Sequence, residues 1–159
     1  MSNCLGIGEC GIDRLRGSNT DHQISVFKQQ AQLAESLRKP FIIHCVRAWL
    51  EVMEIKSKIN PTVPWIVHGF RGKARTAEEL LNNGFNLSFG ESILSMNPVL
   101  TEIVRGTPDD RLFLETDDGK HDIEEIYQAA SVIKNIPLEK LQDITISNFN
   151  AIFGKDLPS

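Results

Sequence analysis

Short apolar runs alternate with helical patterns along the chain, and this alternation limits the possible folds more than any other feature of the sequence. The runs that read as buried strands cover residues 5–9, 41–43, 65–67, 85–89 and 112–114. Between them, apolar residues recur at steps of three and four, which is the spacing of one helix face. Alternating units of this size are typical of βαβ crossovers. The sequence therefore predicts an α/β fold with a mainly parallel sheet.

Three of the expected helices carry their own start signals. Thr20 and Gln23 have the spacing of a capping box, in which Ser or Thr precedes Glu or Gln by three residues. Thr76 and Glu79 repeat that spacing farther along the chain. Pro98 suits the first position of a further short helix. These patterns predict where the three helices begin.

The composition is that of an ordinary globular protein. The 159 residues are 41% hydrophobic and 24% charged, and we expect residues 1–159 to form a single domain. The formal net charge of -4 and the pI of about 5.6 argue against a protein that coats nucleic acid through bulk charge. A local basic surface remains compatible with this balance.

Cysteine usage and hydropathy indicate the compartment. Cys4, Cys10 and Cys45 are odd in number and lack CxxC spacing, which favours free thiols in a reducing environment. No apolar run approaches the roughly 20 residues that span a bilayer. The first residues also lack the pattern of a signal peptide. We therefore expect a cytoplasmic protein with no membrane partner.

Each of four strand patterns leads into a side chain that can bind a metal or move a proton. These residues are Glu9, His44, His68 and Asp117. A single histidine at a strand end is more often inert, but a parallel sheet or barrel brings the ends of all its strands to one face. Two imidazoles and two carboxylates on one face form a plausible site for a divalent metal.

Basic residues follow the same strands. Arg14 comes shortly after Glu9, Arg47 after His44, and Arg71 after His68. Guanidinium groups in these loops would suit a phosphate-bearing substrate, although any one of them is as easily a solvated surface charge. We expect residues 70–72 to form the loop that meets the substrate.

Five short motifs together resemble the TatD family of metal-dependent deoxyribonucleases. Residues 8–13 (GECGID) resemble the family's G-E-x-G-[LI]-D, and residues 43–48 resemble its I-H-[SC]-R-x-A. Residues 68–72 (HGFRG) are similar to H-x-F-x-G, and residues 114–117 to L-E-T-D. Asn148 with residues 152–154 resembles the closing N-x-x-x-[LI]-F-G. The matches follow family order and spacing over nearly the whole chain.

The resemblance implies a TIM-barrel metallohydrolase that removes nucleotides from DNA ends, using one or two Zn²⁺, Mg²⁺ or Mn²⁺ ions. By this resemblance Glu9 bridges two metals, and His44 and His68 hold one of them. Asp117 holds the other and orients the attacking water, so Glu9 and Asp117 are the expected catalytic residues. Arg14, Arg47 and Arg71 are the expected contacts to the phosphates.

The sequence also departs from the family pattern. Family members open with an H-x-H strand and two further strands that have no counterpart here, so we expect about five of the eight barrel strands. A complete barrel takes at least about 200 residues, so we expect residues 1–159 to form the C-terminal portion of a (β/α)8-type barrel. Sheet edges left open would invite pairing between copies, which predicts a possible homo-oligomer.

Three other interpretations follow from the same residues. The chain could be a truncated, catalytically impaired paralogue that still binds metal. It could be an amidohydrolase-like enzyme that acts on a small ester or amide, although the basic loops disfavour this. Cys45 could act as a nucleophile, but a buried cysteine is more often a packing residue, and no activating partners accompany it.

Overall fold

A computed structural model describes residues 4–16 and 19–154 of the chain. These residues form two compact units. The first comprises the described residues up to Val67 together with residues 152–154, and the second comprises His68–Ala151. Among the described residues, no helix combines the length and the apolar character needed to cross a membrane.

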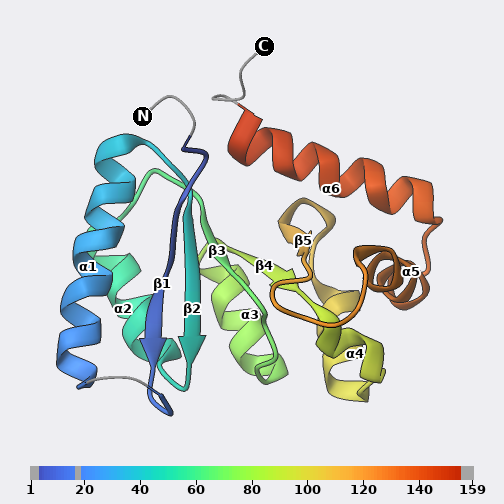
Figure 1. The fold of residues 1–159 in the computed structure, drawn as a ribbon, viewed down its shortest axis with the longest axis horizontal. Coiled ribbons are helices and arrows are strands. Elements are labelled where there is room, and N and C mark those ends of the chain that lie inside the picture. The colour runs from blue at the N-terminus through green and yellow to red at the C-terminus, as the bar shows by residue number, and fades with distance from the viewer. Residues whose placement is uncertain (1–3, 17–18, 155–159) are drawn as a thin grey trace. The chain divides into compact units, whose positions relative to one another are not determined.

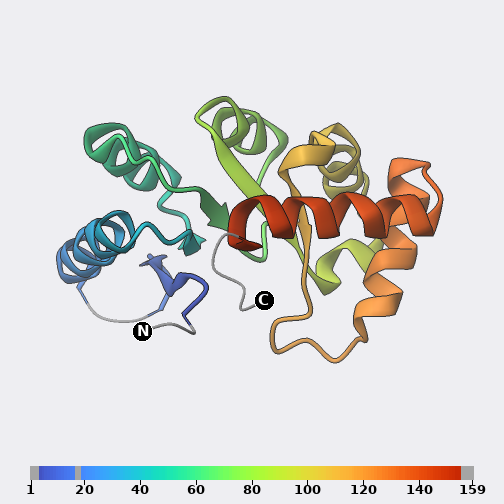
Figure 2. The ribbon, with the colours of Figure 1, turned by 90° about the horizontal axis from the view of Figure 1, so that it is seen from above.

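The first unit contains three parallel strands and two helices. Its elements are β1 (Ile7–Asp13), α1 (Thr20–Leu37), β2 (Phe41–Val46), α2 (Trp49–Ile59) and β3 (Trp65–Val67). The strands lie in the order β1, β2, β3. Helices α1 and α2 contact each other and lie on the same side of β1 and β2 (Figure 1), as the view turned by 90° also shows (Figure 2).

Three aromatic rings fill the space between α1 and the strands. Phe27 of α1 lies 5.2 Å from Phe41 of β2 and 5.7 Å from Trp65 of β3, measured between ring centroids, and all three side chains are fully buried. Tilted and edge-to-face pairs of this kind add about 0.5–1.5 kcal/mol each beyond the burial of their area. Along β2, Phe41, Ile43 and Cys45 are buried while the alternate residues are less so, which places His44 on the opposite face from this core.

The second unit contains two parallel strands and the remaining helices. Its elements are α3 (Ala74–Asn82), β4 (Phe85–Phe89), the 3-10 turn η1 (Glu91–Ser95), α4 (Pro98–Gly106), the 3-10 turn η2 (Asp109–Arg111), β5 (Leu112–Leu114), α5 (Ile123–Lys134) and α6 (Leu138–Phe153) up to Ala151. Strand β4 pairs with β5 and is buried at all of its residues. Helix α3 packs on β4, and α4 contacts both α3 and α5.

Asn148 of α6 secures the start of β5. Its side-chain amide donates hydrogen bonds to the carbonyl oxygens of Asp109 at 2.7 Å and Leu112 at 2.9 Å. The residue is buried, with 7% of its surface exposed. The asparagine of the closing sequence motif is therefore a structural residue that satisfies two backbone carbonyls.

The predicted parallel α/β fold with about five strands is confirmed for the described residues, but two strand boundaries differ. Strand β1 begins at Ile7 and runs to Asp13, and β2 continues to Val46. Glu9 and His44 therefore lie inside strands, whereas His68 directly follows β3 as expected. The extension of β1 beyond Glu9 was not predicted because residues 10–13 lack an apolar alternation.

Gly11 explains why β1 needs that unusual sequence. It pairs with His44 across the ladder, and a Cβ atom at this position would lie 1.8 Å from the carbonyl oxygen of His44. No other residue fits so close an approach of two backbones. The second glycine of the GECGID motif is therefore required by strand packing.

The two predicted capping boxes do not cap their helices, although α1 does begin at Thr20. Helix α1 is capped by Asn19, whose side chain accepts a hydrogen bond from the Asp21 backbone, and α3 begins at Ala74, so that Thr76 lies inside the helix. Gln23 instead binds the backbone of Asp13 through its side chain. The observed capping box lies at the start of α5, whereas α4 begins at the predicted Pro98.

Candidate metal centre

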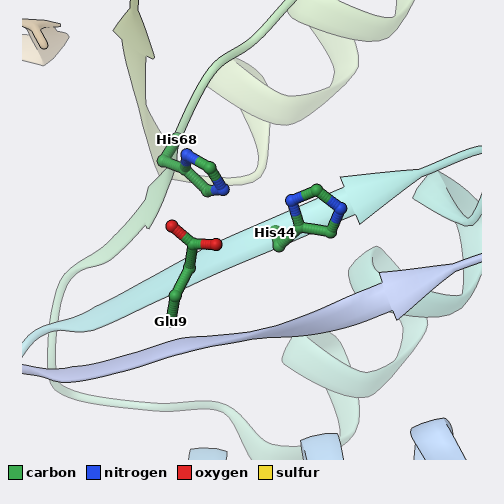
Figure 3. Close-up of side chains that lie close together, drawn as sticks. All are labelled: Glu9, His44 and His68. Carbon is green, nitrogen blue, oxygen red and sulfur yellow. The ribbon is translucent and has the colours of Figure 1, made fainter. Parts of the chain in front are cut away.

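Three of the four predicted ligands come together. Glu9 is on β1, His44 is on β2, and His68 directly follows β3. One carboxylate oxygen and one nitrogen from each imidazole all lie within 4.8 Å of one another, and the three side chains point toward a common centre (Figure 3). Nitrogen and oxygen ligands bind a divalent cation at about 2.0–2.2 Å, so two ligands of one ion lie within about 4.4 Å of each other. The cluster is close to that spacing.

An irregularity in β1 presents Glu9 to the cluster. The pairing with β2 runs from Ile7 opposite Phe41 to Cys10 opposite Ile43, so β1 has one more residue than β2 over this stretch. An extra residue of this kind redirects the side chains next to it. Glu9 is exposed.

The carboxylate of Asp13 contacts the imidazole ring of His44. Its Oδ2 lies 3.4 Å from Nε2 of His44, while its Oδ1 accepts hydrogen bonds from the backbone of Leu15 at 2.7 Å and Arg16 at 3.0 Å. These interactions, led by the Leu15 bond, lower the pKa of the Asp13 carboxyl below its ordinary value. Asp13 is therefore ionised at neutral pH and can orient the imidazole.

Glu115 contacts His68 in the same way, but the side chain of His68 is 10% exposed, whereas that of His44 is 39% exposed. Oε1 of Glu115 lies 3.3 Å from Nδ1 of His68 and accepts a hydrogen bond of 2.7 Å from the Gly69 backbone. Its Oε2 accepts a hydrogen bond from the Ser88 hydroxyl. Burial alone would raise the pKa of Glu115, but the bonds from His68, Ser88 and Gly69 outweigh it and the pKa lies below its ordinary value.

The two carboxylates contact the imidazole nitrogens that do not face Glu9. Asp13 lies at Nε2 of His44 and Glu115 at Nδ1 of His68, and Figure 3 shows the other nitrogen of each ring turned toward the Glu9 carboxylate. A carboxylate partner fixes the tautomer and leaves a lone pair on the opposite nitrogen. Two neutral imidazoles and one carboxylate are a donor set that suits a divalent cation.

Asp117 is not part of this cluster. It is exposed and follows β5 with a φ angle of 49°, and the group of potential ligands formed by the described residues contains only Glu9, His44 and His68. The sequence placed all four residues on one face from the direction of their strands. Asp117 lies three residues beyond β5, where the strand no longer fixes its side chain.

The three predicted phosphate contacts differ in their surroundings. Arg14 forms an ion pair with Glu51 of α2, so a phosphate would have to displace a carboxylate to bind it. Arg47 and Arg71 are exposed. The expectation that residues 70–72 meet a substrate is wrong for Phe70, which is 1% exposed and packs edge-to-face on Phe89 at 6.2 Å.

Cys45 does not provide a nucleophile. Cys4, Cys10 and Cys45 are free thiols, and Cys45 is 9% exposed. Burial raises the pKa of the Cys45 thiol to about 12, so the reactive thiolate does not form at neutral pH. Cys45 is a packing residue.

Sequence reasoning missed Asp13, Ser88 and Glu115. Asp13 belongs to the motif in residues 8–13, and Glu115 to the motif in residues 114–117. Neither spacing nor periodicity reveals that Asp13 contacts a histidine 31 residues away, or that Glu115 contacts one 47 residues away. Ser88 is one of two polar residues, with Asn86, in strand β4, which is buried along its whole length. A polar residue inside a wholly buried strand is the signal that could have indicated it, because a buried hydroxyl needs a partner.

Comparison with known proteins identifies the family. Residues 1–154 match the family model described as TatD related DNase. The protein named uncharacterized metal-dependent hydrolase YabD, from Bacillus subtilis, is 32% identical over 94% of this chain and 65% of its own length. A putative deoxyribonuclease TATDN1 homolog from Vairimorpha ceranae is 29% identical over 97% of this chain and 67% of its own length.

A solved structure shares the fold. The TatD homologue YJJV from Escherichia coli superposes with a TM-score of 0.85 at 20% identity, over 97% of this chain and 64% of that protein. The chain thus spans about two thirds of the length of the relatives that it matches. The match to the family model covers nearly every residue. The chain belongs to the TatD related DNase family.

Proposed function

We propose that this protein is a metal-dependent hydrolase that cleaves phosphodiester bonds at DNA ends. The observation that carries the proposal is the convergence of Glu9, His44 and His68, with both imidazoles oriented by carboxylates. Membership of a family described as DNases and the name of the Vairimorpha relative favour DNA as the substrate.

In this proposal Glu9, His44 and His68 hold one divalent cation, with Zn²⁺, Mn²⁺ and Mg²⁺ as candidates. Such a cation supplies Lewis acidity and lowers the pKa of its water to about 7. The Asp117 carboxylate orients the attacking water and accepts its proton, and it would take part in a second metal site if one forms. The exposed guanidinium groups of Arg47 and Arg71 bind the phosphate oxygens, and Arg14 joins them only by leaving Glu51.

The proposal includes a cytoplasmic location and the possibility of a homo-oligomer. Three free cysteines are consistent with a reducing compartment. Sedimentation analysis of the purified chain tests the oligomer, since a single species at the mass of one chain contradicts it.

A nuclease assay tests the activity. Single-stranded DNA labelled at one end is incubated with the metal-free protein, and Zn²⁺, Mn²⁺ or Mg²⁺ is then added. We expect stepwise shortening that EDTA abolishes and that the His44→Ala/His68→Ala double variant lacks. His22→Ala is the matched control, because His22 is an exposed histidine on α1, and it should retain activity.

Other outcomes of the assay distinguish the alternative functions. Metal binding without shortening of any DNA supports the impaired paralogue. EDTA-sensitive hydrolysis of small esters or amides, with DNA left intact, supports the amidohydrolase-like enzyme. Either result contradicts the proposed nuclease.

A further inference from the structure

We propose that Glu115 and Ser88 are positioning residues that hold His68 in its Nδ1–H tautomer, so that Nε2 faces the metal cluster before any cation binds. The inference rests on the proposed function in one respect, namely that a divalent cation binds beside His68. Three observations within the second unit carry it.

The first observation is the hydrogen bonding around the Glu115 carboxylate. Gly69 donates its backbone N–H to Oε1, and the Ser88 hydroxyl donates to Oε2. An ionised carboxylate only accepts hydrogen bonds. The His68 Nδ1, 3.3 Å from Oε1, must therefore carry the proton, and in a neutral imidazole this leaves the lone pair on Nε2.

The second observation is the burial of the group. The side chain of His68 is 10% exposed and that of Glu115 is 21% exposed, while Ser88 is 4% exposed. Water therefore has little access to compete for the His68 Nδ1 proton, and a hydrogen bond in a setting of low dielectric is stronger than one in water. The imidazole is held by the protein rather than by solvent.

The third observation is that Ser88 holds the chain on both sides of this contact. Its hydroxyl binds Glu115, and its backbone carbonyl accepts a hydrogen bond of 2.9 Å from the N–H of Phe70, two residues after His68. Between them, Gly69 adopts a φ of 56°, a backbone conformation that glycine tolerates and most residues do not. Strand β4 thus fixes both the carboxylate and the turn that carries the imidazole.

Glu115 acts through His68 and is not itself a ligand of the proposed cation. The cluster of potential ligands formed by the described residues omits it. Its contact is at Nδ1, the ring nitrogen turned away from Glu9. Outer carboxylates of this kind orient a metal-binding histidine and raise its basicity, and their loss typically lowers metal affinity about 10–100-fold.

The test uses two readouts on the full chain, with Glu115→Gln as the main variant. The first is the ¹⁵N NMR spectrum of the His68 ring in the metal-free protein, which distinguishes the two neutral tautomers. We expect the wild type to hold the Nδ1–H form, and Glu115→Gln to shift the population toward the Nε2–H form. The second is Zn²⁺ affinity by competition with a chelator, which we expect to fall about 10–100-fold.

Two further variants keep the experiment decisive. Ser88→Ala should shift the His68 population toward the Nε2–H form by a smaller amount. This variant replaces Glu115→Gln in the test if Glu115→Gln does not fold. Glu125→Gln is the matched control, because Glu125 also lies beside an imidazole, with its Oε2 3.2 Å from Nδ1 of the exposed His121. The control loses part of the capping box of α5 and some stability, but it should leave the His68 tautomer and Zn²⁺ affinity unchanged.

The outcomes separate this inference from the proposed function. An unchanged His68 tautomer in folded Glu115→Gln overturns the positioning role, and so does a Zn²⁺ affinity within twofold of the wild type. If the wild type binds no divalent cation, the proposed function fails. The spectrum of the metal-free protein would still show whether Glu115 sets the tautomer.

Discussion

The two histidines of the cluster face the same carboxylate but are held by different parts of the protein. His68 is 10% exposed and lies against a carboxylate that is fixed by β4 and by the turn after β3, whereas His44 is 39% exposed and lies against Asp13 at the end of β1. Asp13 takes its other hydrogen bonds from the backbone of Leu15 and Arg16, which are exposed. The distances from carboxylate to imidazole are nearly equal, at 3.4 Å and 3.3 Å.

The difference indicates how the site prepares for a cation. His68 is held in place by buried hydrogen bonds, so binding requires little further ordering of its ring. His44 has water as a competitor for its partner and loses more freedom when a cation binds. Preorganised ligands contribute more affinity because the ordering cost has already been met by folding. His68 should therefore be the more important ligand.

Removing each histidine tests this ranking with the largest expected effects. Both His68→Ala and His44→Ala remove a ligand, so each should lower Zn²⁺ affinity by more than the about 100-fold upper range for outer partners. The loss should be greater for His68→Ala. Titration with a chelator of known affinity measures both, and an equal or opposite order would contradict the ranking.

Replacing the carboxylate beside His44 should have a smaller effect. In Asp13→Asn the amide keeps the shape of the side chain but loses its charge, and the exposed His44 ring can turn to water instead. We expect Zn²⁺ affinity to fall about tenfold or less, at the low end of the range for outer partners. A loss of Zn²⁺ affinity larger than that of Glu115→Gln, measured under the same conditions, would contradict this expectation. It would show that the exposure of the histidine ring does not govern how much its carboxylate partner contributes.

The unfolding free energy of the metal-free protein at low pH should also depend more on Glu115 than on Asp13. The pKa values of Glu115 and Asp13 are lowered by folding, so each stabilises the fold fully above the ordinary carboxyl pKa of about 4 and loses this contribution as the pH falls through the folded-state value. Chemical unfolding between about pH 2 and 6 should show that Glu115→Gln flattens the fall of unfolding free energy toward low pH. Asp13→Asn should flatten it less. A Glu115→Gln profile parallel to that of the wild type would contradict the assigned pKa direction.

Asn148→Ala should lower the stability of the fold without changing the Zn²⁺ affinity of the candidate site. The variant leaves two backbone carbonyls at the start of β5 without their side-chain donor, and we expect the unfolding free energy to fall by about 1–3 kcal/mol. Zn²⁺ affinity should stay within twofold of the wild type at a temperature where the variant is folded. A clear loss of affinity would mean that the motif asparagine has a role beyond packing.

Much of the fold was predictable because buried parallel strands leave a simple pattern. The runs at 65–67, 85–89 and 112–114 match β3, β4 and β5 because apolar side chains fill them. Strand β1 does not follow this pattern. Gly11 allows the close approach of the neighbouring backbone, and the irregular pairing redirects Glu9, so the strand has no continuous apolar face. The capping patterns at Thr20 and Thr76 were wrong because Asn19, one residue before Thr20, caps α1, and no side-chain hydrogen bond caps α3.

Of the candidate site, only the three residues that cluster together were predictable from the sequence. Glu9, His44 and His68 could be named from strand patterns and motif spacing, and the structure brings them together. Asp117 belonged to the same prediction but lies in a turn beyond β5, where strand direction says little about a side chain. The contacts of Asp13 and Glu115 depend on side-chain positions across the sheet, which no local pattern records.

The metal content of the purified chain tests the central claim most directly. The metal-free protein is equilibrated with Zn²⁺, Mn²⁺ or Mg²⁺, dialysed, and its bound metal is counted by elemental analysis. We expect at least one tightly bound ion per chain in the wild type and in His22→Ala. We expect no bound ion in the His44→Ala/His68→Ala variant. A wild-type chain without metal, or a double variant that retains the same amount, would contradict the claim.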